Sequence, residues 1–202
     1  MVKIKTRAAK KVRNTKETQV TLELKIDGTG KYSIDTPLPF FNHMLETFAR
    51  HGLFDLTLKA RGDVQVDPHH LVEDVGISLG EAFEAAFGKK LGIRRYGFCI
   101  LPMDEVLTTV ALDFCGRPCM VYKNPVKKGR IGNGLFDVEL TPEFFQGFTN
   151  AAKINLHINV NYGRNKHHIV ESIFKAFAKA CDYATSIDHR APTSLPSVKG
   201  KL

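Results

Sequence analysis

Two nearly identical stretches constrain this chain more than any other feature. Residues 69–73 read His-His-Leu-Val-Glu, and residues 167–171 read His-His-Ile-Val-Glu. On a helix, residues four apart share a face while neighbours point roughly 100° apart, so each glutamate pairs with the first histidine of its stretch. An imidazole and a carboxylate one turn apart can hold one divalent cation while the adjacent imidazole reaches a second. Each stretch could therefore serve two metal ions.

The repetition strengthens this interpretation. A single stretch of this kind is typical of a solvated helix start, with the glutamate near the positive end of the helix dipole. Ligand-type side chains in the same arrangement, at matching places in the two halves of one chain, are hard to explain in that way. They favour a metal site and an internal duplication.

The segments around the two stretches follow the same order in each half. Alternating apolar residues predict strands, and apolar residues at helical spacing predict helices. In the first half we expect a hairpin over residues 18–35, a helix over 40–50, a strand over 53–60 and a helix over 69–87. In the second half we expect strands over 98–101, 106–114 and 120–123, a mobile loop over 125–133, a helix capped by Thr141, a strand over 154–161 and a helix over 167–184. We also match Phe40-Phe41 with Phe144-Phe145.

This order predicts an α+β fold of two tandem repeats, each a four-stranded mixed sheet with two helices on one face. The first repeat would span residues 1–92 and the second residues 93–202, together forming one functional domain. The end of the chain, residues 194–202, lacks apolar periodicity. It is typical of a disordered tail, although its Ser, Lys and Gly residues would also suit phosphate binding.

Composition narrows the functional class. The chain has 202 residues and is 43% hydrophobic, which suits a globular protein with a sizeable core. No apolar run approaches the roughly 20 residues of a membrane span, and the first residues lack the apolar core of a signal peptide. We therefore expect a cytoplasmic protein that does not bind membranes. The four cysteines form no CxxC pair, so we expect reduced thiols.

The net charge of +8 raises the question of nucleic-acid binding. The excess is spread along the chain, apart from residues 3–16 and 123–130, and the aromatic motifs that stack on RNA bases are missing. We therefore expect no nucleic-acid partner. A small anionic substrate would need only a few of these charges.

Taken with its other segments, the chain resembles the imidazoleglycerol-phosphate dehydratases of histidine biosynthesis. The resemblance extends from about residue 5 to residue 200. The segments that carry it are Pro39 to Leu45, His51 to Asp55, Asp67 to Asp74, Arg95 to Gly97, Asp104-Glu105, Gly116 to Pro118, Phe144 to Gln146, His167 to Glu171, Lys175 to Phe177 and Pro196 to Gly200.

The resemblance implies a fold of the ribosomal protein S5 domain 2 type and a hydro-lyase activity. The reaction removes water from D-erythro-imidazoleglycerol phosphate and gives imidazole acetol phosphate. The resemblance also implies two Mn²⁺ ions per active site, with ligands drawn from different subunits of metal-linked trimers that assemble into a 24-mer.

The implied metal ligands form two sets. One ion would bind His69, Glu73, Glu143 and His168, and the other would bind His43, His70, His167 and Glu171. The chain departs from the family pattern at three positions, because Glu143 stands where histidine is frequent, and Asn42 and Pro68 stand where aspartate is frequent. A carboxylate at position 143 can still bind Mn²⁺, which favours oxygen ligands.

The implied substrate contacts add residues outside the two histidine stretches. Glu17 is the candidate acid or base, with His43, His70 and Glu171 as the other catalytic residues. Phosphate would be bound by Arg95, Arg117, Lys175, Ser197 and Lys199, since guanidinium and ammonium groups match its oxygens. His43, His69 and Glu73 would also contact substrate. Asp104 and Glu105 could support the metal site or simply end a strand.

Three other functions remain compatible with the histidine stretches or the charge taken alone. A dimetal hydrolase would use the same ligands to cleave a phosphoester. A nucleic-acid-binding module would bind with a steep salt dependence that chelation leaves unchanged. A metal-stabilised shell without catalysis would dissolve on chelation but show no turnover.

Overall fold

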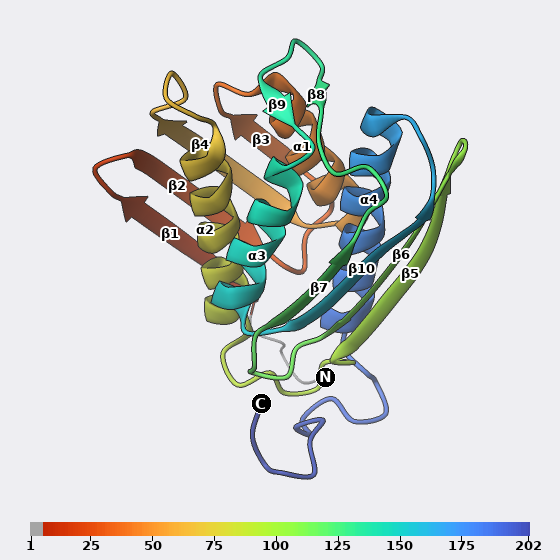
Figure 1. Ribbon diagram of the computed structural model, residues 1–202. Coiled ribbons are helices and arrows are strands. Elements are labelled where there is room, and N and C mark those ends of the chain that lie inside the picture. Colours follow the sequence, from red (N-terminus) through yellow and green to blue (C-terminus); the bar gives the residue numbers. More distant parts are fainter. Residues whose placement is uncertain (1–5) are drawn as a thin grey trace.

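The computed structural model describes residues 6–202, and its first half contains four strands and two helices (Figure 1). Strand β2 shows why the alternating pattern forms a strand, because Val20, Leu22 and Leu24 are buried while the residues between them are exposed. The elements are β1 (Ala8–Asn14), β2 (Thr18–Lys25), β3 (Tyr32–Asp35), α1 (Pro39–Gly52), β4 (Asp55–Gly62) and α2 (His69–Phe87).

The second half repeats this order and adds a short β-hairpin. Its elements are β5 (Tyr96–Met103), β6 (Val106–Asp113), β7 (Cys119–Lys123), β8 (Arg130–Ile131), β9 (Phe136–Asp137), α3 (Leu140–Ala152), β10 (Asn155–Tyr162) and α4 (Lys166–Thr185). Strands β8 and β9 pair with each other, so part of the predicted mobile loop forms a small hairpin. None of the helices within residues 6–202 combines the length and apolar character needed to cross a bilayer.

Both sheets have the same topology. Their strand orders are β1-β2-β4-β3 and β5-β6-β10-β7, and in each sheet only the last pair is parallel. The predicted α+β fold of two tandem repeats with mixed sheets is therefore confirmed. The division between residues 92 and 93 stays a prediction.

The two repeats pack through their helices, which lie between the sheets (Figure 1). Helix α2 contacts α3, and α1 contacts α4. Glycine permits the close approach of α2 to α3, because a Cβ on Gly76 would lie 2.3 Å from the carbonyl oxygen of Phe144. Buried phenylalanines fill the space between the layers, and Phe48 stacks on Phe177 across the α1 and α4 contact.

The predicted hairpin over residues 18–35 is wrong. Strand β4 lies between β2 and β3, and β3 pairs in parallel with β4 after the crossover through α1. The antiparallel partner that β2 needs on its other side is β1, which the sequence pattern did not predict. Strand β1 is an edge strand of alanine, lysine and arginine with little buried apolar surface, so its sequence carries no clear alternation.

Two details of the second repeat also differ from expectation. Helices α1 and α3 end at Leu53 and Lys153, which both have left-handed backbone. When the two repeats are aligned at these helix ends, Glu143 is the equivalent of His43. The predicted match of Phe40-Phe41 with Phe144-Phe145 is therefore wrong by about one helical turn. Thr141 does not cap α3, because the helix begins one residue earlier and Thr141 is fully buried.

Candidate metal centre

The second histidine stretch is held at the start of α4. The side chain of Asn165 caps this helix by accepting hydrogen bonds from the backbone N–H groups of His167 and His168. The helix then places Glu171 one turn after His167, with Nε2 of His167 3.0 Å from Oε2 of Glu171. The pairing predicted from helical spacing is present.

His43 reaches the same carboxylate from α1. Its Nε2 lies 3.7 Å from Oε2 of Glu171. One ligand atom from each of His43, His167 and Glu171 lies within 4.8 Å of the other two. Within residues 6–202, this is the one group of three histidine, cysteine or acidic residues gathered so closely. Two imidazoles and a carboxylate are suitable donors for a divalent transition-metal ion.

Glu171 is kept ionised in a largely buried position, where 8% of the residue is exposed. Burial opposes its ionisation, but the ion pair with Lys175 and the hydrogen bond with His167 outweigh burial and lower the pKa of Glu171 below its usual value. Lys175 binds Oε1 of Glu171 at 2.7 Å. The other oxygen, Oε2, therefore faces the two histidines.

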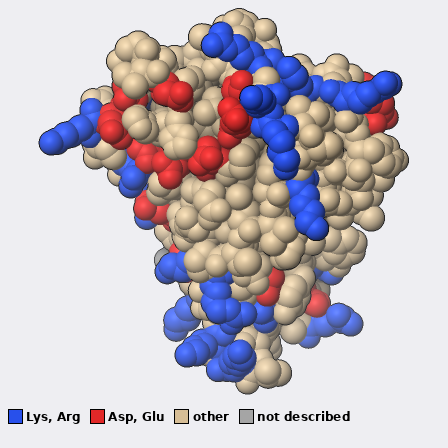
Figure 2. Space-filling model, viewed as in Figure 1, with Lys and Arg blue, Asp and Glu red and all other residues tan. Residues whose placement is uncertain are grey.

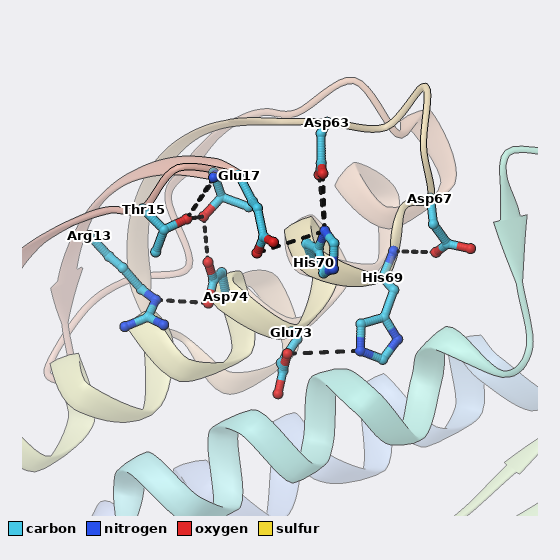
Figure 3. A network of polar contacts seen from close by, with 10 residues as sticks. Arg13, Thr15, Glu17, Asp63, Asp67, His69, His70, Glu73 and Asp74 are labelled. Atoms are coloured by element: carbon cyan, nitrogen blue, oxygen red, sulfur yellow. Dashed lines mark hydrogen bonds and ion pairs between the residues drawn. The ribbon is translucent and has the colours of Figure 1, made fainter.

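The first histidine stretch begins α2 (Figure 3). The carboxylate of Asp67 accepts a hydrogen bond from the backbone N–H of His69, and Pro68 occupies the cap position. Nε2 of His69 lies 3.8 Å from Oε2 of Glu73, as the helical spacing predicts. Glu143 lines an open cavity of about 590 Å³ together with His69.

The second histidine of each stretch is bound by a carboxylate outside its own helix. Nδ1 of His70 lies 3.1 Å from Oδ2 of Asp63 and 3.9 Å from Oε2 of Glu17. Nδ1 of His168 lies 2.8 Å from Oε2 of Glu105. Figure 3 shows His69 and His70 turned to different sides of α2, and their ring planes are 89° apart.

These contacts shift the protonation of the histidines. The hydrogen bond that His70 donates to Asp63 raises the pKa of His70, and the hydrogen bond that His168 donates to Glu105 raises the pKa of His168. Glu105 is shifted in the opposite direction, because its bonds to His168 and to the backbone N–H of Asn165 lower its pKa to about 2.

Sequence reasoning missed the residues that support the first stretch. The sequence pattern assigns no role in the site to Asp63, and Asp74 appears only within a segment that carries the family resemblance. Asp74 is buried, lies 2.8 Å from Nε of Arg13 and accepts a hydrogen bond from the hydroxyl of Thr18. It thereby ties the β1 and β2 hairpin, whose turn carries Glu17, to α2 (Figure 3). The sequence offered one signal for each residue. Asp63 is a charged residue at a strand end, and Asp74 is a charged residue on the buried face of a helix.

Asn42, one of the departures from the family pattern, does not bond to His43. Its side-chain oxygen accepts hydrogen bonds from the backbone N–H and the hydroxyl of Thr36, and its amide donates to the Thr36 carbonyl oxygen. The residue therefore fixes the entry into α1 rather than the histidine beside it.

Most of the predicted phosphate-binding residues lie far from the histidines within one chain. The guanidinium of Arg95 forms an ion pair with Asp113 at 2.7 Å and donates to the carbonyl oxygen of Pro196 at 2.9 Å. The Ser197 hydroxyl donates to the Lys201 carbonyl oxygen and accepts from the backbone N–H of Lys199. Arg117 lies in the turn after β6. Lys175 instead lies beside the histidines, because it forms an ion pair with Glu171.

Acidic side chains gather on one part of the surface, whereas basic side chains lie at both ends of the molecule. In the view of Figure 2, Asp and Glu side chains gather at the upper left, and Lys and Arg side chains gather at the lower end, near the termini, and also across the upper right. Arg95 is at the lower end, because its backbone N–H bonds to the carbonyl oxygen of Ala184 in the last turn of α4.

Comparison with known proteins gives one consistent result. A family model described as imidazoleglycerol-phosphate dehydratase matches residues 36–181. Imidazoleglycerol-phosphate dehydratase of Citrifermentans bemidjiense is 56% identical over 97% of this chain and 99% of its own length. The same enzyme of Geobacter sulfurreducens is 55% identical over 94% of this chain and 96% of its own length.

Solved structures agree with the sequence comparisons. The chain is similar to imidazoleglycerol-phosphate dehydratase of Staphylococcus aureus, with a TM-score of 0.80 and 34% identity over 90% of this chain and 99% of that one. The chain is also similar to imidazoleglycerol-phosphate dehydratase of Pyrococcus furiosus, with a TM-score of 0.77 and 34% identity over 95% of this chain and 100% of that one. The chain therefore belongs to the imidazoleglycerol-phosphate dehydratase family and is a dehydratase, a carbon–oxygen lyase, of histidine biosynthesis.

Proposed function

We propose that this dehydratase uses two Mn²⁺ ions to eliminate water from D-erythro-imidazoleglycerol phosphate, giving imidazole acetol phosphate. The observation that supports the proposal most strongly is the gathering of His43, His167 and Glu171, whose ligand atoms lie within 4.8 Å of one another. Mn²⁺ accepts both imidazole nitrogen and carboxylate oxygen. The donor set of this chain therefore fits the proposed ion.

The proposed ligand sets are those implied by the family resemblance. His43, His70, His167 and Glu171 would hold one ion, and His69, Glu73, Glu143 and His168 would hold the other. In one chain, three members of the first set lie together, but His70 is held by Asp63 at the start of α2. Similarly, His168 is held by Glu105 at the start of α4. We infer that the missing histidines come from neighbouring copies of the chain.

The separation of the predicted phosphate residues supports the same inference. Roughly 24 Å of helix, at about 1.5 Å per residue, lies between His168 and Ala184, where Arg95 is bound. A three-carbon chain between an imidazole and a phosphate cannot bridge this distance, since each C–C bond adds only about 1.5 Å. One substrate molecule would therefore contact histidines of one copy and Arg95, Ser197 and Lys199 of another, as trimers assembling into a 24-mer would allow.

The side chains have distinct roles in the proposed reaction. Bound to the imidazole ring, the two ions would stabilise its deprotonated form and so help the ring to expel the hydroxyl. A carboxylate oxygen of Glu17 would accept the proton that leaves the substrate carbon. Its side chain is 55% exposed and stands in the turn between β1 and β2, where a substrate can reach it.

The experiment is a turnover assay on metal-stripped protein with and without added Mn²⁺. With Mn²⁺ and imidazoleglycerol phosphate, we expect the enol or ketone signal of the product and no free phosphate. The variant His167→Ala should lose this activity, whereas Glu23→Gln, which removes an exposed carboxylate paired with Lys10, should retain it. Phosphate release would favour the hydrolase, and turnover unaffected by complete metal removal would contradict the proposal.

A further inference from the structure

The two repeats carry carboxylates at equivalent strand ends. Glu17 immediately precedes β2, and Glu105 immediately precedes β6. These strands are equivalent, because each is the antiparallel neighbour of the strand that leads into a histidine stretch. At the other strand end the repeats differ. Asp63 immediately follows β4, whereas Gly163 immediately follows β10.

In the second repeat, Glu105 is fully engaged in holding its histidine. Oε2 lies 2.8 Å from Nδ1 of His168, and Oε1 accepts from the backbone N–H groups of Arg164 and Asn165. Gly163 offers no second carboxylate. It could not readily be replaced by aspartate, because its φ is +147° and a Cβ would lie 2.7 Å from a methyl group of Val106.

In the first repeat, Asp63 holds the histidine instead. Its carboxylate oxygens lie 3.1 and 3.3 Å from Nδ1 of His70, and its backbone N–H donates to the carbonyl oxygen of Glu17. The Glu17 carboxylate stands at 3.9 Å from Nδ1, outside hydrogen-bonding distance. Figure 3 shows His70 between these two acidic side chains.

We propose that Asp63 and Glu105 are the positioning residues of His70 and His168, and that Asp63, by binding His70, leaves the equivalent glutamate Glu17 free to contact substrate. An ionised carboxylate can only accept a hydrogen bond, so Nδ1 must donate and Nε2 is left with its lone pair facing outward. The inference rests on the proposed function, and it goes further by explaining why two equivalent glutamates differ in role.

The test is a double-mutant cycle read by Mn²⁺ binding to the metal-stripped protein. Asp63→Ala should weaken binding by no more than about threefold, because the Glu17 carboxylate can move onto His70. Glu17→Ala, which removes this possible replacement acceptor, should by itself leave binding unchanged. The double variant should weaken it by about 10- to 100-fold, which is the usual cost of removing such a partner. Additive losses, or an equal loss in Asp63→Ala and the double variant, would overturn the proposal.

Turnover gives a second readout that a merely structural role would not produce. Asp63→Ala should lower kcat strongly while Mn²⁺ affinity is nearly retained, since Glu17 is diverted from substrate. Asp63→Asn keeps an acceptor oxygen and should recover most of kcat. An Asp63→Ala variant with normal kcat would contradict the release of Glu17. Glu23→Gln is the matched control for loss of an exposed carboxylate.

The second repeat supplies the complementary test. Among residues 6–202, the only other carboxylate within ion-pair distance of the His168 ring is that of Asp104, which lies 3.6 Å from Nε2 and not beside Nδ1. Glu105→Ala therefore leaves Nδ1 without a carboxylate, and the single change should already weaken Mn²⁺ binding by about 10- to 100-fold. Glu105→Gln should recover part of it. If a variant fails to fold, the ring ¹⁵N chemical shifts of the wild-type protein at high pH still test the positioning roles. His70 and His168 should both carry their proton on Nδ1, and a proton on Nε2 would overturn the proposal. Failure of the proposed function is distinct, since the wild-type protein would then show no Mn²⁺-dependent turnover.

Discussion

Lys175 and Glu171 form an ion pair across one turn of α4, with Nζ 2.7 Å from Oε1, while Oε2 of the same carboxylate faces His167 at 3.0 Å. The lysine that the family resemblance assigns to phosphate thus binds a predicted metal ligand. Because one oxygen is occupied by the lysine, the carboxylate is oriented with the other oxygen toward the histidines.

Replacing Lys175 should show whether it orients the predicted metal ligand Glu171 or binds the substrate phosphate. In Lys175→Gln the cation that lowers the pKa of Glu171 is lost, so the pKa should rise and Mn²⁺ should bind about tenfold more weakly. Mn²⁺ titration of the metal-stripped variant measures this loss. If KM for substrate rises while Mn²⁺ affinity is unchanged, Lys175 acts on phosphate alone.

The pair of Glu105 and His168 should give the metal-free protein a bell-shaped stability contribution. The pKa of Glu105 is lowered from 4.5 to about 2, so its contribution is present above pH 4.5 and is lost as the pH falls toward 2. The pKa of His168 is raised from 6.5, so its contribution is present below pH 6.5 and is lost as the pH rises through the raised value. The Tm difference between wild-type and Glu105→Gln proteins should therefore be largest between pH 4.5 and 6.5. A difference that does not vary with pH would argue against this pair.

Asp74 should matter for both stability and turnover. Asp74→Ala leaves Arg13 and Thr18 without their partner on α2, and loss of a hydrogen bond to a charged group should lower the free energy of unfolding by about 2 kcal/mol. Denaturant unfolding of the metal-free protein measures this change. The kcat should also fall, because the hairpin that carries Glu17 loses its polar contacts with α2. Thr18→Ser, which keeps the hydroxyl, should behave as the wild type, and a fully stable Asp74→Ala protein would contradict the assignment.

Gly76 should tolerate no side chain. A Cβ would lie 2.3 Å from the carbonyl oxygen of Phe144, so Gly76→Ala should force α2 away from α3 and cost about 1–3 kcal/mol. The helix starts that carry Glu73 and Glu143 would then separate, and Mn²⁺ binding should weaken as well. Thermal unfolding and Mn²⁺ titration of the same variant test both effects. An unchanged Tm would mean that the helices can shift without loss of packing.

The sequence predicted those parts of the site that depend on local geometry. His167 and Glu171 meet because four residues make about one helical turn. The approach of His43 to Glu171 depends on the packing of α1 on α4, and it was expected only from the family resemblance.

The supporting contacts were predictable to a smaller extent. Asp63 reaches His70 because β4 ends beside the start of α2, and neither periodicity nor spacing reports that distance. Strand β1 was missed because its alanine, lysine and arginine residues show no clear alternation and bury little apolar surface. With β1 missing, β3 was the nearest available partner for β2, which produced the incorrect hairpin.

The most direct measurement of the central claim is anomalous diffraction at the manganese absorption edge from crystals grown with Mn²⁺. We predict two ions per chain. His43, His167 and Glu171 of one copy would bind one ion with a histidine of a neighbouring copy, and His69 and Glu73 would bind the other. Crystals saturated with Mn²⁺ in which these side chains hold no ion, or bind ions within a single isolated chain, would contradict the account.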